Sequence, residues 1–378
     1  MRIIFHIDSL GSGGAQRQIV TLALGMMARG HDVEFNTYFP FDHFTSALKQ
    51  AEIPVHYKSK GGRFSLSPLM RLRCHVRRFR ADAVIAFLRT PVLHAELLKI
   101  LCPGTRVVVS ERSFFPKGNL SCSLRATQAF HRLADAVAVN SQHQADRMLA
   151  EFPWLRGKIH VVLNGYDLSG APTPISELKG ELHLLSLASV HAGKNPMALA
   201  RALRICRVDK GLPVSIRWAG EPWIVDGRYE AKEEVDAYLT KHGLSDAWQW
   251  LGLRSDVPQL FEDVHALVHT SLGEGFANVV AEALIAARPV LLGRIGDQVN
   301  LVEQSRAGLL FDPQSPDSIA CAIDDFHAMT DKNRMQMAQS GRTFAEANLS
   351  LDIMVERYIA LCRPSYTGQD KTIIQDKG

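Results

Sequence analysis

Short apolar runs alternate with helical patterns twice along this chain of 378 residues. In the first half, the expected strands are Ile3–Ile7, Asp32–Phe39, Ala83–Phe87, Val107–Ser110, Ala136–Asn140 and His160–Leu163. The expected helices are Ala15–Ala28, Leu93–Leu101 and Leu120–Leu133. Regular alternation of this kind predicts a parallel, doubly wound sheet, because parallel strands need a crossover segment between them.

The alternation stops at a polar stretch, Leu168–Gly180, which contains Pro172 and Pro174, and then begins again. The second series has strands at Leu182–Leu187, Val214–Ala219, Gln249–Leu251, Ala266–Thr270 and Pro289–Leu292, with a helix at Met197–Cys206. We therefore predict an α/β chain with two Rossmann-like parallel-sheet domains that face each other across a cleft. The predicted parts are an N-terminal domain at 1–168, a linker at 169–181, a C-terminal domain at 182–350, and a helix with a polar tail at 351–378.

Composition limits the class of protein and the cellular compartment that fit this chain. Hydrophobic residues make up 46% and charged residues 22%, as in water-soluble globular proteins. No apolar run approaches the roughly 20 residues of a membrane-spanning helix. The apolar run at Met1–Ile7 is too short for a signal peptide, and the six cysteines are scattered without a C-x-x-C pair. We expect reduced thiols and a cytoplasmic protein.

The charges are distributed unevenly. Residues 1–170 hold 22 Lys and Arg against 12 Asp and Glu, whereas residues 171–378 hold 21 against 27. The segment Lys58–Arg80 contributes eight cations and no acid, and its apolar residues recur at helical spacing. One interpretation is contact with anionic lipid at the inner membrane face. The alternative is an ordinary crossover helix whose apolar stripe packs on the sheet. Nucleic acid is not expected, because aromatic interleaving and a binding module are missing.

The most informative pair of residues is Glu274 and Glu282, in the run Glu-Gly-Phe-Ala-Asn-Val-Val-Ala-Glu. The first is expected in the loop after a buried strand, and the second in the first turns of an apolar helix. Open α/β sheets bind their ligands beside the carboxyl ends of their strands, where such loops and helix starts lie. Free N–H groups at a helix start suit a phosphate, and carboxylates accept hydrogen bonds from sugar hydroxyls. A nucleotide-sugar pocket and a merely structural pair of glutamates both fit this pattern.

Three further groups are candidates, each with a structural alternative. Gly11–Gly14 follows the first expected strand and can approach an anion at a helix start, although it is not a G-x-G-x-x-G motif. Lys194 follows the first strand of the second series and can neutralise a diphosphate, or it can be an ordinary solvated lysine. Arg89, Glu111 and Arg112 lie at strand ends, where they can bind an acceptor or form an ion pair. No H-E-x-x-H or strand-end Asp-x-Asp motif occurs, so we expect neither a metal nor a cofactor.

In combination these segments resemble the retaining glycosyltransferases of family 4, which have the GT-B fold. The resemblance extends from residue 1 to about residue 360. It rests on Gly-Gly-Ala-Gln-Arg (13–17), Leu-Asn-Gly-Tyr-Asp (163–167), Gly-Lys-Asn-Pro (193–196), the segment 274–282, and Gly-Leu-Leu-Phe (308–311) with Pro313. The C-terminal half is most similar to the branch that builds bacterial surface polysaccharides, including lipopolysaccharide. The resemblance also implies that the C-terminal helix packs back on the N-terminal domain.

The resemblance implies a role for each matching position. Glu282 binds the ribose hydroxyls of the donor, and Glu274 contacts the sugar that is transferred. The backbone amides of Gly275, Phe276, Ala277 and Asn278 line the donor, while Lys194 and the amide at Gly14 hold its diphosphate. Glu274 and Lys194 are thus the expected catalytic residues, and the acceptor is expected on the N-terminal domain.

Two positions depart from the family pattern. Relatives usually carry an arginine five residues before the lysine, where this chain has Ser189; Arg254 and Arg294 are candidate substitutes. Many relatives also have a histidine after the strand that corresponds to Val107–Ser110, where this chain has Glu111 and Arg112. No catalytic histidine is therefore assigned.

The resulting hypothesis is a metal-independent, retaining hexosyl- or N-acetylhexosaminyltransferase. Its expected donor is a nucleotide sugar, with UDP favoured over GDP, and its expected acceptor is a saccharide or lipid-linked saccharide. The alternatives are a nucleotide-sugar epimerase or hydrolase on the same scaffold, and a non-catalytic sugar-nucleotide-binding subunit.

Overall fold

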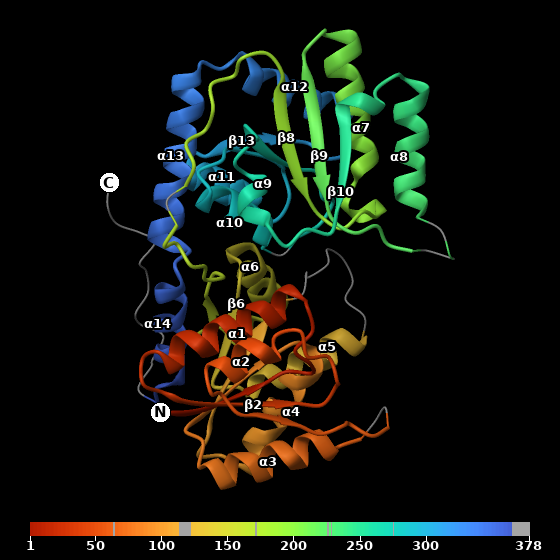
Figure 1. Cartoon of the computed structure of the whole chain (residues 1–378). Helices are drawn as coiled ribbons and strands as arrows, with labels where there is room; N and C mark the ends of the chain where they lie inside the picture. Colours follow the sequence, from red (N-terminus) through yellow and green to blue (C-terminus); the bar gives the residue numbers. More distant parts are fainter. Residues whose placement is uncertain are drawn as a thin grey trace. The chain divides into compact units, whose positions relative to one another are not determined.

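The computed structural model describes residues 1–62, 65–112, 122–170, 172–224, 227, 229–274 and 276–364. The chain divides into two compact units (Figure 1). Unit 1 comprises Met1–Tyr166 and Ser350–Gly378, and unit 2 comprises Asp167–Leu349. Each unit is built around its own parallel sheet, which confirms the predicted α/β fold with two Rossmann-like sheets.

The sheet of unit 1 has the strand order β3-β2-β1-β4-β5-β6-β7. Its strands are β1 (Arg2–His6), β2 (Asp32–Thr37), β3 (Val55–Tyr57), β4 (Ala83–Phe87), β5 (Arg106–Glu111), β6 (Ala136–Val139) and β7 (Ile159–Val161). Its helices are α1 (Gly14–Met27), α2 (Thr45–Gln50), α3 (Ser67–Phe79), α4 (Arg89–Leu101), α5 (Cys122–Ala129), α6 (Gln142–Glu151) and α14 (Leu351–Cys362). Short turns of 3-10 helix are η1 (Phe130–Arg132) and η2 (Pro153–Leu155).

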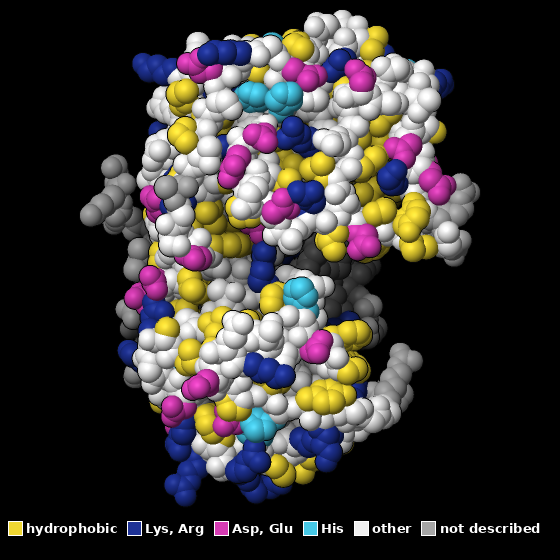
Figure 2. Space-filling view, in the orientation of Figure 1, with side chains coloured by type: hydrophobic (Ala, Val, Ile, Leu, Met, Phe, Trp, Pro, Cys, Tyr) yellow, Lys and Arg dark blue, Asp and Glu magenta, His cyan; other side chains and the backbone are white. Residues whose placement is uncertain are grey.

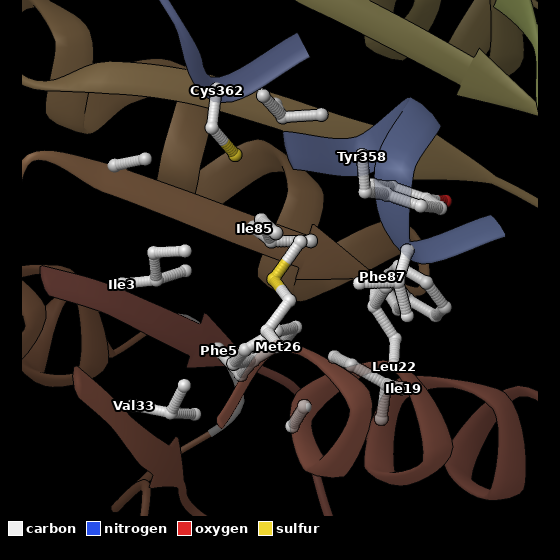
Figure 3. Close-up of a cluster of buried hydrophobic side chains, with 14 of the residues drawn as sticks. Ile3, Phe5, Ile19, Leu22, Met26, Val33, Ile85, Phe87, Tyr358 and Cys362 are labelled. Atoms are coloured by element: carbon white, nitrogen blue, oxygen red, sulfur yellow. The ribbon is translucent and has the colours of Figure 1, made fainter. Parts of the chain in front are cut away.

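Alternating residues of β1, β4, β5 and β6 belong to two separate apolar cores on the two faces of the sheet of unit 1. Ile3 and Phe5 of β1 belong to one apolar cluster, and Ile4 between them belongs to the other. A strand that is buried on both faces reads as a continuous apolar run, which is why β4 is so clear in the sequence. Figure 3 shows Tyr358 and Cys362 of α14 in the first cluster, beside side chains of the early strands.

The last helix therefore completes the first unit, as the sequence predicted. The contact between α1 and α14 is close enough to require a glycine. A Cβ added at Gly25 would lie 2.6 Å from a methyl carbon of Val355. This side of the unit 1 sheet thus depends on a segment more than 300 residues away in the chain.

The sheet of unit 2 has the strand order β10-β9-β8-β11-β12-β13. Its strands are β8 (Leu182–Leu187), β9 (Val214–Ala219), β10 (Trp248–Gly252), β11 (Ala266–His269), β12 (Val290–Gly293) and β13 (Gly308–Phe311). Its helices are α7 (Pro196–Arg204), α8 (Glu230–Lys241), α9 (Val257–Leu260), α10 (Asn278–Ile285), α11 (Gln298–Ser305), α12 (Pro316–Ala328) and α13 (Asp331–Asn348). Short turns are η3 (Ala192–Lys194), the π-type η4 (Ile205–Asp209) and η5 (Ser245–Ala247).

The segment predicted as a linker packs on unit 2. Ile175 is buried with Ala287 and Ala338, and the backbone N–H of Leu178 donates to Asp331 at 3.0 Å. The buried Arg288 guanidinium donates to the carbonyl oxygen of Thr173 at 2.8 Å. Over the residues searched, which are those that the structure describes, no helix is long and apolar enough to cross a membrane.

Candidate active site

The strand order of unit 2 changes direction at β8. From β8 the sheet continues through β9 and β10 on one side and through β11, β12 and β13 on the other. The loops that leave β8 and β11 therefore start side by side at the carboxyl edge of the sheet, where open α/β sheets bind ligands. Lys194 lies at the end of the loop after β8, and Glu274 lies in the loop after β11. The two predicted catalytic residues thus flank the switch point.

The structure brings these two residues into direct contact. The Nζ atom of Lys194 donates to the Oε1 atom of Glu274, forming an ion pair. The same carboxylate oxygen lies 3.1 Å from Nε2 of His269, the last residue of β11. His269 is only 2% exposed, and the side chains of Glu274 and Lys194 are 16% and 23% exposed. One carboxylate is thus held by two nitrogen donors, of which the lysine remains accessible.

Hydrogen bonds between the two loops fix the positions of these side chains. The N–H of Leu272 donates to the carbonyl of Gly193 at 2.9 Å, and the hydroxyl of Thr270 donates to the carbonyl of Lys194 at 2.9 Å. Asn195 adopts a left-handed conformation with φ of 56° and donates its amide to the carbonyl of Pro313 at 2.6 Å. Asparagine tolerates this conformation better than most residues, so it suits the sharp exit from η3 into α7.

The electrostatic environment keeps Glu274 ionised. Burial by itself raises the pKa of this carboxyl, but the hydrogen bond and charge of His269 and the charge of Lys194 outweigh it. The net result lowers the pKa of Glu274 from 4.5 to about 2. A carboxylate that stays charged at all physiological pH values is an acceptor only. It therefore suits hydrogen bonding to hydroxyl groups or stabilisation of positive charge, and it cannot serve as a general acid.

The helix that follows Glu274 offers backbone donors. The N-cap of α10 is Ala277, which has no side-chain oxygen to cap the first N–H groups. Phe276, Ala277 and Asn278 are all partly buried, and Glu282 lies partly buried in the second turn. Gly275 lies outside the described residues. Glu274 thus lies in the loop after β11 and Glu282 in the helix that follows, which are the elements predicted for these two residues.

In unit 1 the equivalent switch point lies between β1 and β4. Gly14 is the first residue of α1, whose N-cap Gly13 makes no side-chain capping bond. Arg89 is the first residue of α4 and follows Leu88, which adopts a positive φ of 72°. The exposed Arg89 side chain donates to the hydroxyl of Thr127 at 3.3 Å. These two predicted residues thus lie at neighbouring strand ends of the same sheet.

Glu111 is buried in unit 1, and Arg112 beside it is partly buried. Gln128 donates to the buried Glu111 carboxylate at 3.4 Å. The Arg112 guanidinium donates to Ser110 at 3.0 Å and to the side chain of Asn164, and it stacks 4.1 Å from the centre of the Phe87 ring. These contacts hold both side chains in place, but none of them is the ion pair between Glu111 and an arginine that was the predicted alternative to acceptor binding.

Sequence reasoning missed His269 and Asn195. His269 reads as part of a buried strand, and only its position as the last polar residue before the loop signals another role. Asn195 stands next to Lys194, but its contact with Pro313 joins segments that are 118 residues apart. The contact of Asn195 depends on which segments become neighbours in the fold. The contact of His269 is local, five residues from Glu274, but it depends on the path of the loop after β11, which spacing does not reveal.

Comparison with known proteins defines the class. Residues 12–169 match the family model "Glycosyltransferase Family 4", and residues 181–328 match the model "Glycosyl transferases group 1". With its two parallel sheets and the carboxylate and lysine at the switch point, the chain is a glycosyltransferase of the GT-B fold. It belongs to glycosyltransferase family 4.

Two curated relatives and one solved structure show the extent of the similarity. An N-acetylgalactosaminyltransferase of Campylobacter jejuni, named for a diphospho-undecaprenol-linked acceptor, is 24% identical over 75% of this chain and 78% of its own. The lipopolysaccharide glucosyltransferase WaaG of Escherichia coli is 22% identical over 88% and 91%. The crystal structure of HepE from Anabaena in complex with UDP has a TM-score of 0.82 at 21% identity, covering 95% and 98%.

Proposed function

We propose that this chain transfers a hexosyl or N-acetylhexosaminyl group from a UDP-sugar to a saccharide or lipid-linked saccharide, with retention and without a metal ion. The observation that carries the proposal is the Glu274 carboxylate, held between Lys194 and His269 at the switch point of unit 2. Its pKa of about 2 leaves it as a permanent acceptor for sugar hydroxyls. The lysine has three N–H donors, so it can bind Glu274 and a diphosphate oxygen together.

We propose the following roles, which the arrangement of Lys194, Glu274 and α10 in unit 2 supports. Glu274 accepts hydrogen bonds from the transferred sugar. It also orients Lys194, which neutralises charge on the diphosphate. Phe276, Ala277 and Asn278 offer backbone amides at the start of α10, and Glu282 accepts the ribose hydroxyls. In this scheme the acceptor oxygen attacks the anomeric carbon on the face that the diphosphate leaves, and a diphosphate oxygen takes the acceptor proton.

The identities of donor and acceptor rest on the relatives. HepE binds UDP, which supports a UDP-sugar. The names of the Campylobacter and Escherichia relatives refer to a lipid-linked saccharide and to lipopolysaccharide, which supports an acceptor of this kind and a role in surface polysaccharide synthesis. Unit 1 has a hollow of about 540 Å³ whose lining includes Leu10, directly before the Gly-rich loop, and the aromatic residues Phe39, Phe41 and Tyr57. We place the acceptor on unit 1, with Arg89 as the most accessible of its predicted ligands.

Peripheral contact with an anionic membrane is part of the proposal. Lys and Arg side chains gather around α3 (Figure 2), within the segment Lys58–Arg80. Arg63 of this segment lies outside the described residues. The apolar stripe of α3, Leu69, Leu72 and Val76, is buried in the core of unit 1. Contact with lipid would therefore be electrostatic, at about 1 kcal/mol per well-placed cation, without insertion of the helix.

A panel of nucleotide sugars tests the proposed donor. A ligand at 100 times its Kd stabilises the native state by about 2.7 kcal/mol, so the correct UDP-sugar should raise the Tm by several degrees. GDP-sugars should give a smaller shift, and added EDTA should change neither the shift nor the rate of transfer. Donor turnover at an equal rate without any acceptor would instead support a hydrolase or epimerase. No shift with any UDP- or GDP-sugar would contradict the proposal.

Arg294 is the better candidate to replace the family arginine that is missing at Ser189. Arg294 directly follows β12, the neighbour of β11, and its side chain is exposed at the carboxyl edge. Arg254 follows the more distant β10 and already forms a two-pronged ion pair with Asp256. Arg294→Gln should therefore weaken UDP-sugar binding about 10-fold, as expected for one charge-assisted hydrogen bond, and Arg254→Gln by less than 2-fold. Calorimetric Kd values for both variants decide between the two arginines.

A further inference from the structure

Two histidines and one glutamate of unit 1 converge at one edge of its sheet. Glu34 lies on β2, His56 on β3 and His75 on α3, and one possible ligand atom from each lies within 4.8 Å of the others. The Oε2 atom of Glu34 is 2.6 Å from Nε2 of His75 and 2.7 Å from Nε2 of His56. We propose that these three side chains form a zinc-binding site.

The fold itself directs the three side chains to a common point. Asn36 is the register partner of His56, and Glu34 precedes Asn36 by two positions. The side chains of Glu34, Asn36 and His56 therefore lie on one face of the sheet. The same face is covered by α3, because Leu72 and Val76 join the core cluster of Ile4, which pairs with Glu34. His75 lies between these two apolar residues of α3 on the sequence and is buried with them.

The kinds of donor atom point to zinc among the common divalent ions. Two imidazole nitrogens and one carboxylate oxygen suit Zn²⁺, whereas Ca²⁺ and Mg²⁺ require oxygen ligands. Three protein ligands leave the fourth tetrahedral position to a water molecule. Access for water and metal is available beside His56, whose side chain is 38% exposed, compared with 18% for Glu34 and 4% for His75.

The observed distances are close to those of a metal site. Ligand atoms around a tetrahedral zinc ion lie about 3.3 Å apart, so the contacts to Glu34 have to lengthen by roughly 0.6 Å. Small side-chain rotations of Glu34 and His56 provide this movement, since neither is fully packed. The Nδ1 atom of His75 lies 3.4 Å from the side-chain amide of Asn36. With the oxygen of that amide turned toward it, Nδ1–H can donate, which leaves Nε2 free for the metal.

The site has a structural consequence for unit 1. The edge strand β3 is only three residues long, and α3 carries part of the basic segment Lys58–Arg80. A zinc ion would join β3, β2 and α3 and stabilise this edge. Arg78 interacts electrostatically with His75, and the cluster contributes a single carboxylate. The surrounding positive charge thus opposes any dication, so binding has to come from strong coordination bonds, as zinc forms with imidazole.

The test uses the full chain after removal of metals with a chelator. Zinc is titrated in competition with a chromophoric chelator, and we expect one ion per chain with a submicromolar Kd. His56→Ala and Glu34→Gln should each weaken zinc binding about 100-fold or more, because each removes a ligand. The matched control is His43→Ala, which removes an exposed histidine of the same unit and should leave the Kd unchanged.

Cobalt provides a second readout that hydrogen bonding alone cannot produce. Co²⁺ bound by the wild-type chain should show the intense visible absorption of tetrahedral coordination, and His56→Ala should abolish it. Melting curves in chelator confirm that each variant is folded before metal is added. Equal zinc affinity in the wild type, His56→Ala and Glu34→Gln, or no binding to the wild type at micromolar zinc, would overturn the proposal.

Discussion

Glu274→Gln is expected to lower kcat of glycosyl transfer by about 100- to 1,000-fold while nucleotide binding changes by less than 3-fold. The substitution keeps the size of the side chain but removes the charge that pairs with Lys194 and His269. Loss of one preorganised electrostatic contact in an active site typically costs this much. Steady-state kinetics with the best UDP-sugar of the panel, together with calorimetric binding of UDP, measure the two effects separately.

The ion pair between Glu177 and Lys179 provides a matched control. These residues also form an ion pair in unit 2, at 2.8 Å, but both side chains are more than half exposed. Glu177→Gln should leave transfer unchanged, because surface ion pairs contribute little. Wild-type activity of Glu274→Gln would show that Glu274 does not act in the transfer. A loss of UDP binding equal to the loss of transfer would show that Glu274 contacts the nucleotide and not the sugar.

The same variant makes a prediction about pH. The folded-state pKa of Glu274 is lowered, so its stabilising contribution is complete above its ordinary value of 4.5 and is lost as the pH falls toward about 2. The difference in unfolding free energy between wild type and Glu274→Gln should therefore be constant from pH 7 to about pH 5 and shrink below that. Any fall in kcat between pH 5 and 7 must originate from another group.

Lys194→Met is expected to weaken binding of the nucleotide sugar by about 10- to 100-fold and to reduce kcat as well. A charge-assisted hydrogen bond contributes about 1.5–3 kcal/mol, and the diphosphate would lose one such donor. The loss also leaves Glu274 without its lysine partner, so the carboxylate is oriented by His269 alone. The weaker binding of the nucleotide sugar distinguishes this variant from Glu274→Gln, in which kcat falls while nucleotide binding is nearly unchanged.

Binding isotherms for UDP and for uridine separate the diphosphate from the nucleoside. The lysine variant should bind uridine as the wild type does, because uridine has no phosphate. Lys179→Met is the control for removal of a lysine from unit 2. An equal loss of affinity for UDP and uridine would show that Lys194 does not act on the diphosphate.

Much of the architecture could be read from the chain before its structure. The segments Ala83–Phe87 and Leu182–Leu187 are strands in the structure with the predicted bounds. Strands covered on both faces are rich in apolar residues, which holds for every residue of the first segment and for the four leucines of the second. The short edge strand β3 was not predicted, since Val-His-Tyr shows no apolar run and is paired only through β2. Arg89 was expected at a strand end, ahead of a helix at Leu93, but it already opens α4.

The sequence by itself determined that the chain has two Rossmann-like series, and that Lys194 and Glu274 each follow a strand. Strand ends and helix starts leave a local signature in residue type and spacing, which is why these features were readable. Only the tertiary structure decided that β8 and β11 are neighbours, which pairs Lys194 with Glu274, a residue 80 positions away in the chain. It also decided that Glu34, His56 and His75 meet, and that α14 belongs to unit 1. These contacts join residues that are distant in the chain, and long-range pairing has no local signature because it depends on the packing of the whole unit.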